Sequence, residues 1–225
     1  MAQKINPTSF RIGIQKSWVL TLQSYGKNFK KSKIALQSLW VLTLLKLFSK
    51  KLLFTSYSFI ISQSQIFFIF YFFHEQKKTD FLSVFFNYCQ MYFRNWFLVP
   101  NKIRFFYKSK FFLSSSLILS YAVTLIQKSW SLKKIVLLIT QLLNSSLNKT
   151  KVINSKFGLK RVKLKGFKVD LNGRFENSKS QMSSHYQQVV GTLPLISINN
   201  HIEFSSLTVF TKLGSCTIRI WLFFN

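Results

Sequence analysis

The sequence predicts an α+β protein, in which helices and strands mix in the first half and a helix precedes a small mixed or antiparallel sheet in the second. Three observations predict this class. Apolar residues recur at helical spacing over 131–147. They alternate with polar residues, as in half-buried strands, over 167–172 and over 217–224. A chain of 225 residues is also long enough to bury a substantial core.

The first 22 residues are expected to form an extended basic arm, because Pro7 and Gly13 disfavour a long helix there. A helix is predicted next, over 32–49, where apolar residues recur at helical spacing. Asp80 is positioned to cap a helix over 81–93. A short strand is expected over 102–110. With the two strands described next, the first half takes the order β-α-β-β-α-β.

The range 52–73 carries no charge and approaches the length of a membrane span, as does 111–127. A protein with two spanning segments is therefore one interpretation. Polar residues fall at the middle of the first range, at 62–65, where they are most costly in hydrocarbon. They favour a hairpin of two strands, over 52–61 and 66–73. In the second range, serines at 114–116 are suited to capping an amphipathic helix.

The second half begins with the helix over 131–147, and 144–158 is the best candidate for a linker. A strand is expected over 167–173, and a second around Ile196 to Phe204. In the last strand, one face carries Ile218, Ile220, Leu222 and Phe224, and the other carries Thr217, Arg219, Trp221 and Phe223. We expect Trp221 and Phe224 to be core residues, not base-stacking platforms.

Positive charge dominates the composition. The chain has 32 Lys and Arg against five Asp and Glu, a formal net charge of +27. Such repulsion disfavours a compact free domain unless a polyanion neutralises it, and nucleic-acid phosphate is the usual source. Anionic lipid is the alternative. The 26 Phe, with abundant Lys, Ile, Asn and Ser, are typical of AT-rich coding and indicate an organellar genome. Because no signal or transit peptide is recognisable, we expect synthesis inside the organelle.

The residues that usually carry chemistry are scattered. Cys89 and Cys216 lie far apart without paired spacing, so we expect apolar fillers and neither a disulfide nor a zinc site. His74, His185 and His201 share no spacing with cysteines or carboxylates. No metal, cofactor or catalytic pair is therefore expected, and the protein is predicted not to be an enzyme.

Both ends of the chain resemble the ribosomal small-subunit protein three family. At the start, the resemblance is carried by AQKINP (2–7), FRIGI (10–14) and KSW (16–18). Toward the end, it is carried by GFKVDLNGR (166–174), Tyr186, LPL (193–195), IEF (202–204), Thr211, Gly214 and RIW (219–221). The middle of the chain resembles the family weakly.

This resemblance implies three parts: an N-terminal arm (1–22), a divergent KH-like domain of the second type (23–112) and a C-terminal α+β domain (113–225). A KH domain clamps nucleic-acid backbone with a G-x-x-G loop. The matching place here reads Gln76-Lys77-Lys78-Thr79, in which both glycines are absent. We therefore expect Lys77 and Lys78 to make loose phosphate contacts at most.

The resemblance also implies which basic residues meet RNA. The expected ribosomal RNA contacts are Lys4, Arg11, Lys16, Lys160, Arg161, Lys163, Lys165 and Arg174. For the run at 160–168, a disordered basic linker is the other interpretation. In the family, a basic cluster on the helix before the C-terminal domain faces messenger RNA where it enters the decoding channel. Lys133 and Lys134 match two of its positions, and Leu137 stands at a third. A solvated helix face is the other interpretation here.

The function implied is that of a structural constituent of an organellar ribosome, mitochondrial rather than plastid. The protein would bind small-subunit ribosomal RNA in the head and line the side where messenger RNA enters. The implied neighbours are small-subunit proteins ten and fourteen, with four and five across the entrance. The resemblance also implies that no segment spans a membrane. A free RNA-binding or maturation factor is a further alternative beside the membrane protein.

Overall fold

The computed structural model describes residues 5–16, 18, 20–22, 53–61, 65–73, 79–96, 100–107, 114–155, 158–175 and 182–225. The chain divides into two compact units. One contains residues 1–17 and 110–225, and the other contains residues 18–109. In the described residues, one unit combines a helix with a sheet and the other combines several helices with a sheet, so the predicted α+β class is confirmed.

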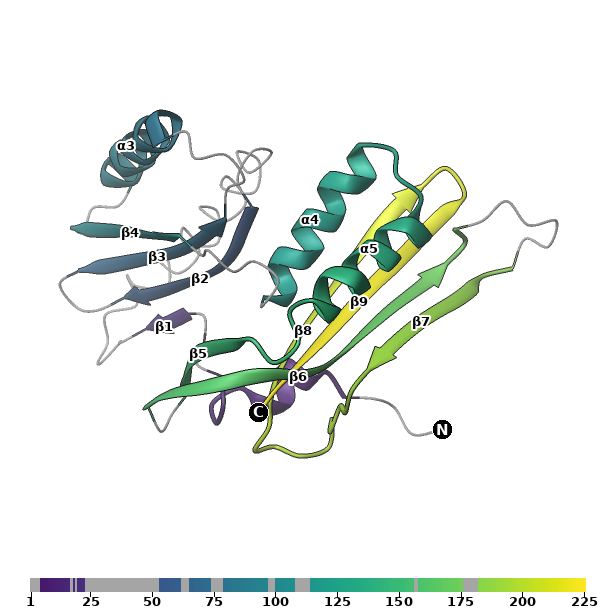
Figure 1. Cartoon of the computed structure of the whole chain (residues 1–225). Coiled ribbons are helices and arrows are strands. Elements are labelled where there is room, and N and C mark those ends of the chain that lie inside the picture. Colours follow the sequence, from purple (N-terminus) through teal and green to yellow (C-terminus); the bar gives the residue numbers. More distant parts are fainter. Residues whose placement is uncertain are drawn as a thin grey trace. The chain divides into compact units, whose positions relative to one another are not determined.

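Within its described residues, the unit 18–109 holds a four-stranded sheet of order β1-β2-β3-β4 (Figure 1). The strands are β1 (Leu20–Leu22), β2 (Leu53–Ile61), β3 (Ile66–Phe73) and β4 (Asn101–Tyr107). The central pair, β2 and β3, is antiparallel, whereas β1 pairs parallel with β2 and β4 pairs parallel with β3. Helix α3 (Thr79–Trp96) lies between β3 and β4 in the sequence, as a parallel connection requires.

Within the uncharged range 52–73, β2 and β3 pair antiparallel as the predicted hairpin, which confirms that interpretation. Alternation buries one face of it: Phe59, Phe68 and Phe70 are almost fully inaccessible to solvent. The rings of Phe59 and Phe68 meet edge to face at 5.2 Å, and Phe93 of α3 lies 5.5 Å from Phe68. Across the described residues, the structure contains no helix with the length and apolar character needed to cross a membrane.

Three predictions for this half need comment. The helix expected over 32–49 lies outside the described residues. Helix α3 starts at Thr79, so Asp80 lies within its first turn and is not the residue before it. The strand expected over 102–110 is β4, which begins one residue earlier and is described to Tyr107.

The unit containing the C-terminus is built on a five-stranded antiparallel sheet of order β5-β6-β9-β8. The fifth strand, β7, pairs with residues 167–173 of β6, whereas β5 pairs with residues 158–163. Its strands are β5 (Thr150–Ser155), β6 (Gly158–Gly173), β7 (Ser184–Val190), β8 (His201–Thr211) and β9 (Gly214–Phe224). Helices α4 (Ser115–Gln127) and α5 (Leu132–Asn144) cover one face of this sheet (Figure 1). These are the helices that periodicity predicted in 111–127 and 131–147.

The core lies between those helices and the inner face of the sheet. The alternating residues predicted for the last strand are all buried there, together with their neighbours on β6 and α5: Ile218, Ile220, Leu222, Phe224, Phe167, Val169, Leu171, Ile135 and Ile139. Trp221 and Phe223, on the opposite face of β9, pack with Ile202 in a second cluster. Both predicted core residues of this strand, Trp221 and Phe224, are therefore confirmed. Cys89 and Cys216 are free and buried, as expected of apolar fillers.

The linker predicted over 144–158 is wrong. Residues 150–155 form β5, and β6 begins at Gly158, well before the expected start at 167. Basic residues conceal the strand pattern, because the ladder between β5 and β6 buries Ile153 and Val162 against the core while Arg161 and Lys163 face solvent. The strand expected around Ile196 begins only at His201, and Ile196 is 92% exposed in the turn before it.

A β-bulge shifts the register of β6 against β9 between Leu164 and Gly166. It changes which side of the strand faces the core, from Val162 and Leu164 before the bulge to Phe167 and Val169 after it. A Cβ at Gly166 would lie 2.4 Å from the carbonyl oxygen of Thr192. Glycine at this position therefore permits a close approach of two backbones.

The N-terminal segment forms a short helix, α1 (Pro7–Arg11), that packs against β8. Asn6 caps it by accepting a 2.9 Å hydrogen bond from the Thr8 amide, and Pro7 occupies the first helical position. The predicted absence of a long helix holds for the described residues 5–16. The segment is folded onto the C-terminal unit instead of extending as an arm.

Candidate nucleic-acid interface

The first part of β6 and its partner β5 form a two-stranded ribbon. The ladder between β6 and β9 begins at Leu164, so over 158–163 the described partner strand of β6 is β5. Figure 1 shows this ribbon extending past the end of β9. We call residues 150–155 and 158–163 the basic ribbon.

Four exposed cations line the basic ribbon and the bulge that follows it. Lys160, Arg161, Lys163 and Lys165 are all exposed. Arg161, Lys163 and Lys165 alternate with buried Val162 and Leu164, so they lie on one side of the strand. A hydrogen-bonded strand fixes their spacing, which a disordered linker would not do. The structure therefore replaces the linker interpretation with an ordered row of positive charge.

Among the described residues, no carboxylate forms an ion pair with Arg161, Lys163 or Lys165. Arg161, Lys163 and Lys165 can therefore offer donors to phosphate oxygens, contacts that fix a protein's register on nucleic acid without reading sequence. Lys168, the next cation on β6, is used differently. Its Nζ lies 3.3 Å from Asp170 Oδ2 and 5.1 Å from the ring centre of Trp221.

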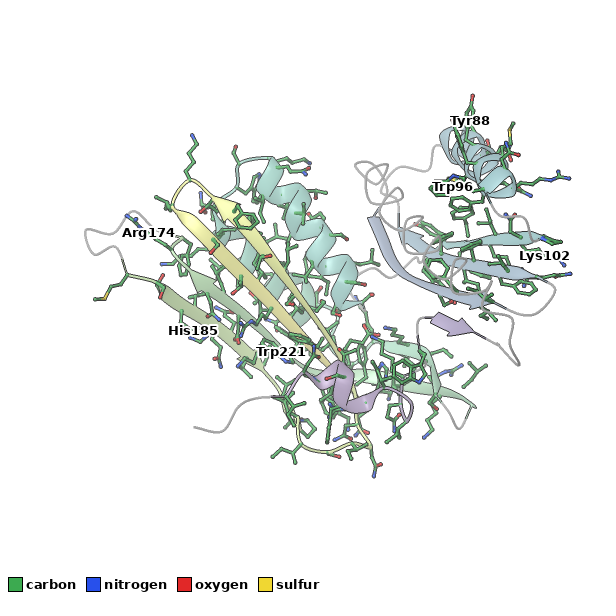
Figure 2. The ribbon with its side chains drawn as sticks, turned by 180° about the vertical axis from the view of Figure 1, so that it is seen from behind. Tyr88, Trp96, Lys102, Arg174, His185 and Trp221 are labelled. Atoms are coloured by element: carbon green, nitrogen blue, oxygen red, sulfur yellow. The ribbon has the colours of Figure 1, made fainter. Side chains whose placement is uncertain are left out.

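Arg174, another predicted RNA contact, follows Gly173 at the end of β6. Its side chain is partly buried, and its Nε is a buried donor without a hydrogen-bond partner among the described residues. Its carbonyl accepts a 3.1 Å hydrogen bond from the Cys216 thiol. Figure 2 shows Arg174 and Trp221 toward opposite ends of the sheet. The basic ribbon uses the first residues of β6, whereas Arg174 follows its last residue. Any RNA contact that Arg174 makes would therefore be separate from the ribbon.

Arg11 is buried, with 2% of its surface exposed. Its guanidinium donates hydrogen bonds to the carbonyls of Pro7, Leu195, Ser197 and Asn200 at 2.6–3.1 Å. Burial lowers the pKa of Arg11 from its ordinary value. With its donors occupied by main chain, Arg11 holds the N-terminal segment in place, and we leave it out of the proposed RNA contacts. Of the other expected contacts here, Lys16 is partly buried and Lys4 lies outside the described residues.

Lys133 and Lys134 lie in the first turn of α5. Lys134 is exposed, whereas Lys133 is partly buried with its Nζ 5.7 Å from the ring centre of Phe175. Leu137 follows Lys134 by three residues and is 45% exposed, so it lies on the same outer face. The geometry thus gives a mixed helix surface on which Lys134 is exposed and Lys133 is partly buried.

An ion pair that sequence reasoning missed anchors the basic ribbon. Lys151 of β5 pairs with Glu203 of β8, and the Ser115 amide at the start of α4 donates a 3.3 Å hydrogen bond to the other carboxylate oxygen. Burial by itself would raise the pKa of Glu203. The charge of Lys151 and the nearby His201, whose Nε2 lies 3.7 Å away, outweigh burial and hold that pKa well below its ordinary value. No sequence signal joins residues so far apart.

Gln76, Lys77 and Lys78 of the expected KH loop lie outside the described residues, and Thr79 is the first residue of α3. Among the described residues, no group of three or more His, Cys, Asp or Glu side chains is arranged to hold a metal ion.

Comparison with known proteins decides the family. Small ribosomal subunit protein uS3m of Chondrus crispus is 34% identical to this chain over 231 residues, covering 100% of this chain and 95% of that protein. The chain belongs to the uS3m family. A second member, uS3m of Acanthamoeba castellanii, is 32% identical over 63 residues, or 28% of this chain and 20% of that protein. No protein-family model matches the chain. The predicted small-subunit protein three family is confirmed, and the similarity to the first uS3m spans the weakly resembling middle as well as both ends.

Proposed function

We propose that this protein is a structural constituent of the small subunit of the mitochondrial ribosome and that its basic ribbon binds ribosomal RNA backbone. Full-length similarity to a uS3m protein supports the ribosomal role, which is structural and not enzymatic. The observation that carries the RNA contact is the exposed row of Arg161, Lys163 and Lys165 on an ordered strand. Phosphate contacts of this kind position a protein without reading sequence.

The ribbon is suited to rigid backbone contact because both of its strands are fixed to the core. Ile153 and Val162 are buried on its inner side, and the pair of Lys151 with Glu203 joins β5 to β8 and α4. Cations held on such a support lose less freedom on binding than cations on a free tail. The same rigidity would let the strand define the orientation of an RNA helix.

A finer arrangement belongs to the same proposal. The three parts would be the arm (1–22), a divergent KH-like domain (23–112) and the C-terminal domain (113–225), with the protein in the head of the subunit. The helix connection between the parallel strands β3 and β4 is compatible with a KH-like element. Lys133 and Lys134 would line the side where messenger RNA enters. Neighbours would be small-subunit proteins ten and fourteen, with four and five across the entrance.

The RNA contact can be tested by removing two charges from the ribbon. The double variant Arg161→Ala/Lys163→Ala should bind small-subunit ribosomal RNA more weakly and reduce the slope of log affinity against log salt by about 1.4–1.8. A matched control, Lys128→Ala/Lys212→Ala, removes two exposed charges elsewhere in the same unit. Equal affinities and slopes for the two double variants would remove the ribbon from the interface.

The ribosomal role has its own test, which separates it from that of a free RNA-binding or maturation factor. The protein should be present at one copy per purified small subunit after washing in high salt and detergent. A maturation factor would bind RNA with a steep salt dependence yet be substoichiometric in mature subunits.

A further inference from the structure

The sheet of the unit 18–109 has one face that is unlike the other. The face toward α3 is packed with Phe59, Phe68 and Phe70. The opposite face carries a continuous row across three strands, because Ile60 of β2 pairs with Phe67 of β3, which pairs with Lys102 of β4. The next row contains Ser58, Ile69 and Arg104. We call these two rows the open face.

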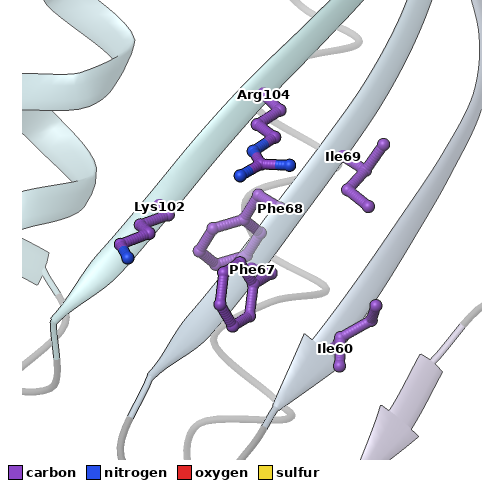
Figure 3. Close-up of a pocket in the computed structure, with 6 residues that line it drawn as sticks. All are labelled: Ile60, Phe67, Phe68, Ile69, Lys102 and Arg104. Atoms are coloured by element: carbon purple, nitrogen blue, oxygen red, sulfur yellow. The ribbon is translucent and has the colours of Figure 1, made fainter.

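The open face is hollowed. A groove of about 270 Å³ is lined by Ile60, Phe67, Phe68, Ile69, Lys102 and Arg104. Figure 3 shows the two cations on one strand beside the apolar residues of the next, with Ile60 on the far side. Ile60 is 41% exposed, and Phe67 and Ile69 are partly exposed. The floor is therefore apolar and open, and the edge is positively charged.

Aromatic rings and positively charged side chains lie close together on this sheet. Lys102 Nζ is 5.8 Å from the ring centre of Phe67. In the row beyond Arg104, Tyr71 and Phe106 stack with their ring centres 5.5 Å apart. Figure 2 shows Lys102 projecting at the outer edge of this sheet, where β4 is the last strand in the order.

The charge balance of the open face selects an anionic occupant. None of the strands β2, β3 and β4 contains an acidic residue, and the one acid among the described residues of this unit is Asp80 in α3. A planar ring on Phe67 with a phosphate beside Lys102 or Arg104 would satisfy both the apolar floor and the charged edge. Single-stranded RNA presents that combination, because its unstacked bases expose both faces while its backbone carries the charge.

We propose that the open face binds single-stranded RNA, with a base stacked on Phe67 and the backbone phosphates contacting Lys102 and Arg104. This contact differs in kind from that of the basic ribbon, which would meet backbone without stacking. The proposal rests on the proposed ribosomal function only for which RNA the open face binds in the cell. The interaction itself can be measured on the isolated full chain.

The experiment uses the full chain and a short fluorescent oligouridylate as the probe, with a short RNA duplex as the comparison. Phe67→Leu keeps an apolar side chain but removes the ring. It should weaken oligouridylate binding about tenfold without changing the salt slope. Phe67→Trp keeps an aromatic ring and should bind oligouridylate as tightly as wild type. Lys102→Ala/Arg104→Ala should reduce the slope of log affinity against log salt by about 1.4, the value for two phosphate contacts on single strands.

The control is Phe210→Leu, which removes a ring that is 85% exposed in the other unit. It should leave oligouridylate binding unchanged, and Phe67→Leu should leave duplex binding unchanged because paired bases offer no free face. Oligouridylate affinity that is the same for Phe67→Leu and wild type would overturn the inference. The inference would also be overturned if small subunits that carry Phe67→Leu lost a neighbouring protein but kept their RNA contacts. Absence of the wild-type chain from small subunits would instead refute the proposed function, while the oligouridylate measurement would still decide the role of the open face.

Discussion

The guanidinium of Arg11 donates a 2.6 Å hydrogen bond from Nη2 to the main-chain carbonyl of Ser197, which lies 186 residues further along the chain. The same group also binds the carbonyls of Leu195 and Asn200, so it joins α1 to the segment that precedes β8. The two ends of the sequence that resemble the ribosomal family most specifically therefore meet in one unit. The N-terminal segment therefore packs as part of the C-terminal unit.

Replacing Arg11 by Met should destabilise the C-terminal unit. The variant keeps most of the apolar stem but leaves several buried carbonyls without donors, and we expect a loss of about 3 kcal/mol. Urea unfolding would measure this loss, and limited proteolysis should show earlier cleavage near residues 5–16. Lys16→Met is the matched control because Lys16 lies nearby on the same segment. Equal unfolding midpoints for the two variants would contradict a structural role for Arg11.

Glu203→Gln should change how stability depends on pH. The pKa of Glu203 is lowered in the folded protein, so its contribution is complete above the ordinary value of 4.5 and is lost as the pH falls below it. At neutral pH the variant should be less stable by about 3 kcal/mol, because it leaves Lys151 without its carboxylate. The difference between wild type and variant should shrink as the pH is lowered from 5 toward 2.

Thermal unfolding at a series of pH values would follow this convergence. Lys151→Met/Glu203→Gln serves as the control, since removing both charges avoids an unpaired cation and should cost less than Glu203→Gln alone. A pH-independent difference between wild type and Glu203→Gln would show that the carboxylate charge does not stabilise this junction.

Gly166→Ala should destabilise the sheet at the bulge. The added Cβ would lie 2.4 Å from the Thr192 carbonyl oxygen, and a Cβ added at Gly191 would lie 2.3 Å from the Lys165 carbonyl oxygen, so neither backbone can yield easily. Overpacking of this kind typically costs about 1–3 kcal/mol. Denaturant unfolding would measure the change, with Lys165→Ala as the control at the exposed neighbouring position. A Gly166→Ala variant as stable as Lys165→Ala would mean that the strands separate without cost.

Lys133→Ala/Lys134→Ala should impair translation of structured messages severalfold if these residues line the path of messenger RNA. Assembly of the small subunit should continue, because neither residue is part of the buried cluster of α5. Translation of structured and unstructured reporters in isolated mitochondria would measure the effect. Gln141→Ala, another exposed position on α5, is the control. We expect Lys134 to contribute more than Lys133, whose cation already lies near Phe175. Unchanged translation of structured reporters would remove this role.

Local patterns predicted the regular elements well where one face is apolar. The break at 62–65 in an uncharged run correctly favoured a hairpin, and the alternation of Ile218, Ile220 and Leu222 correctly identified the buried face of β9. Prediction failed where charge masks the alternation. The segment of β5 was interpreted as part of a linker because it is polar and basic, and β6 was expected to begin only at 167. For β7 no prediction was made, since its seven residues are mostly polar.

The candidate site was predictable in composition but not in arrangement. Sequence reasoning selected Arg161, Lys163 and Lys165 because they are basic, and the structure places all three on the exposed side of one strand. The same reasoning selected Arg11, which the fold buries. A cation's exposure depends on distant segments that cover it, and a local window contains no information about them.

The sequence by itself determined the α+β class, the ribosomal family and the excess of positive charge, because composition, periodicity and motif spacing are properties of the chain. Tertiary structure alone decided which charges are available. It assigned Arg11 to main-chain carbonyls, paired Lys151 with Glu203 and left Lys102 and Arg104 beside an open aromatic surface. The physical reason is that burial and electrostatic pairing depend on contacts between residues far apart in sequence, which form only when the chain folds.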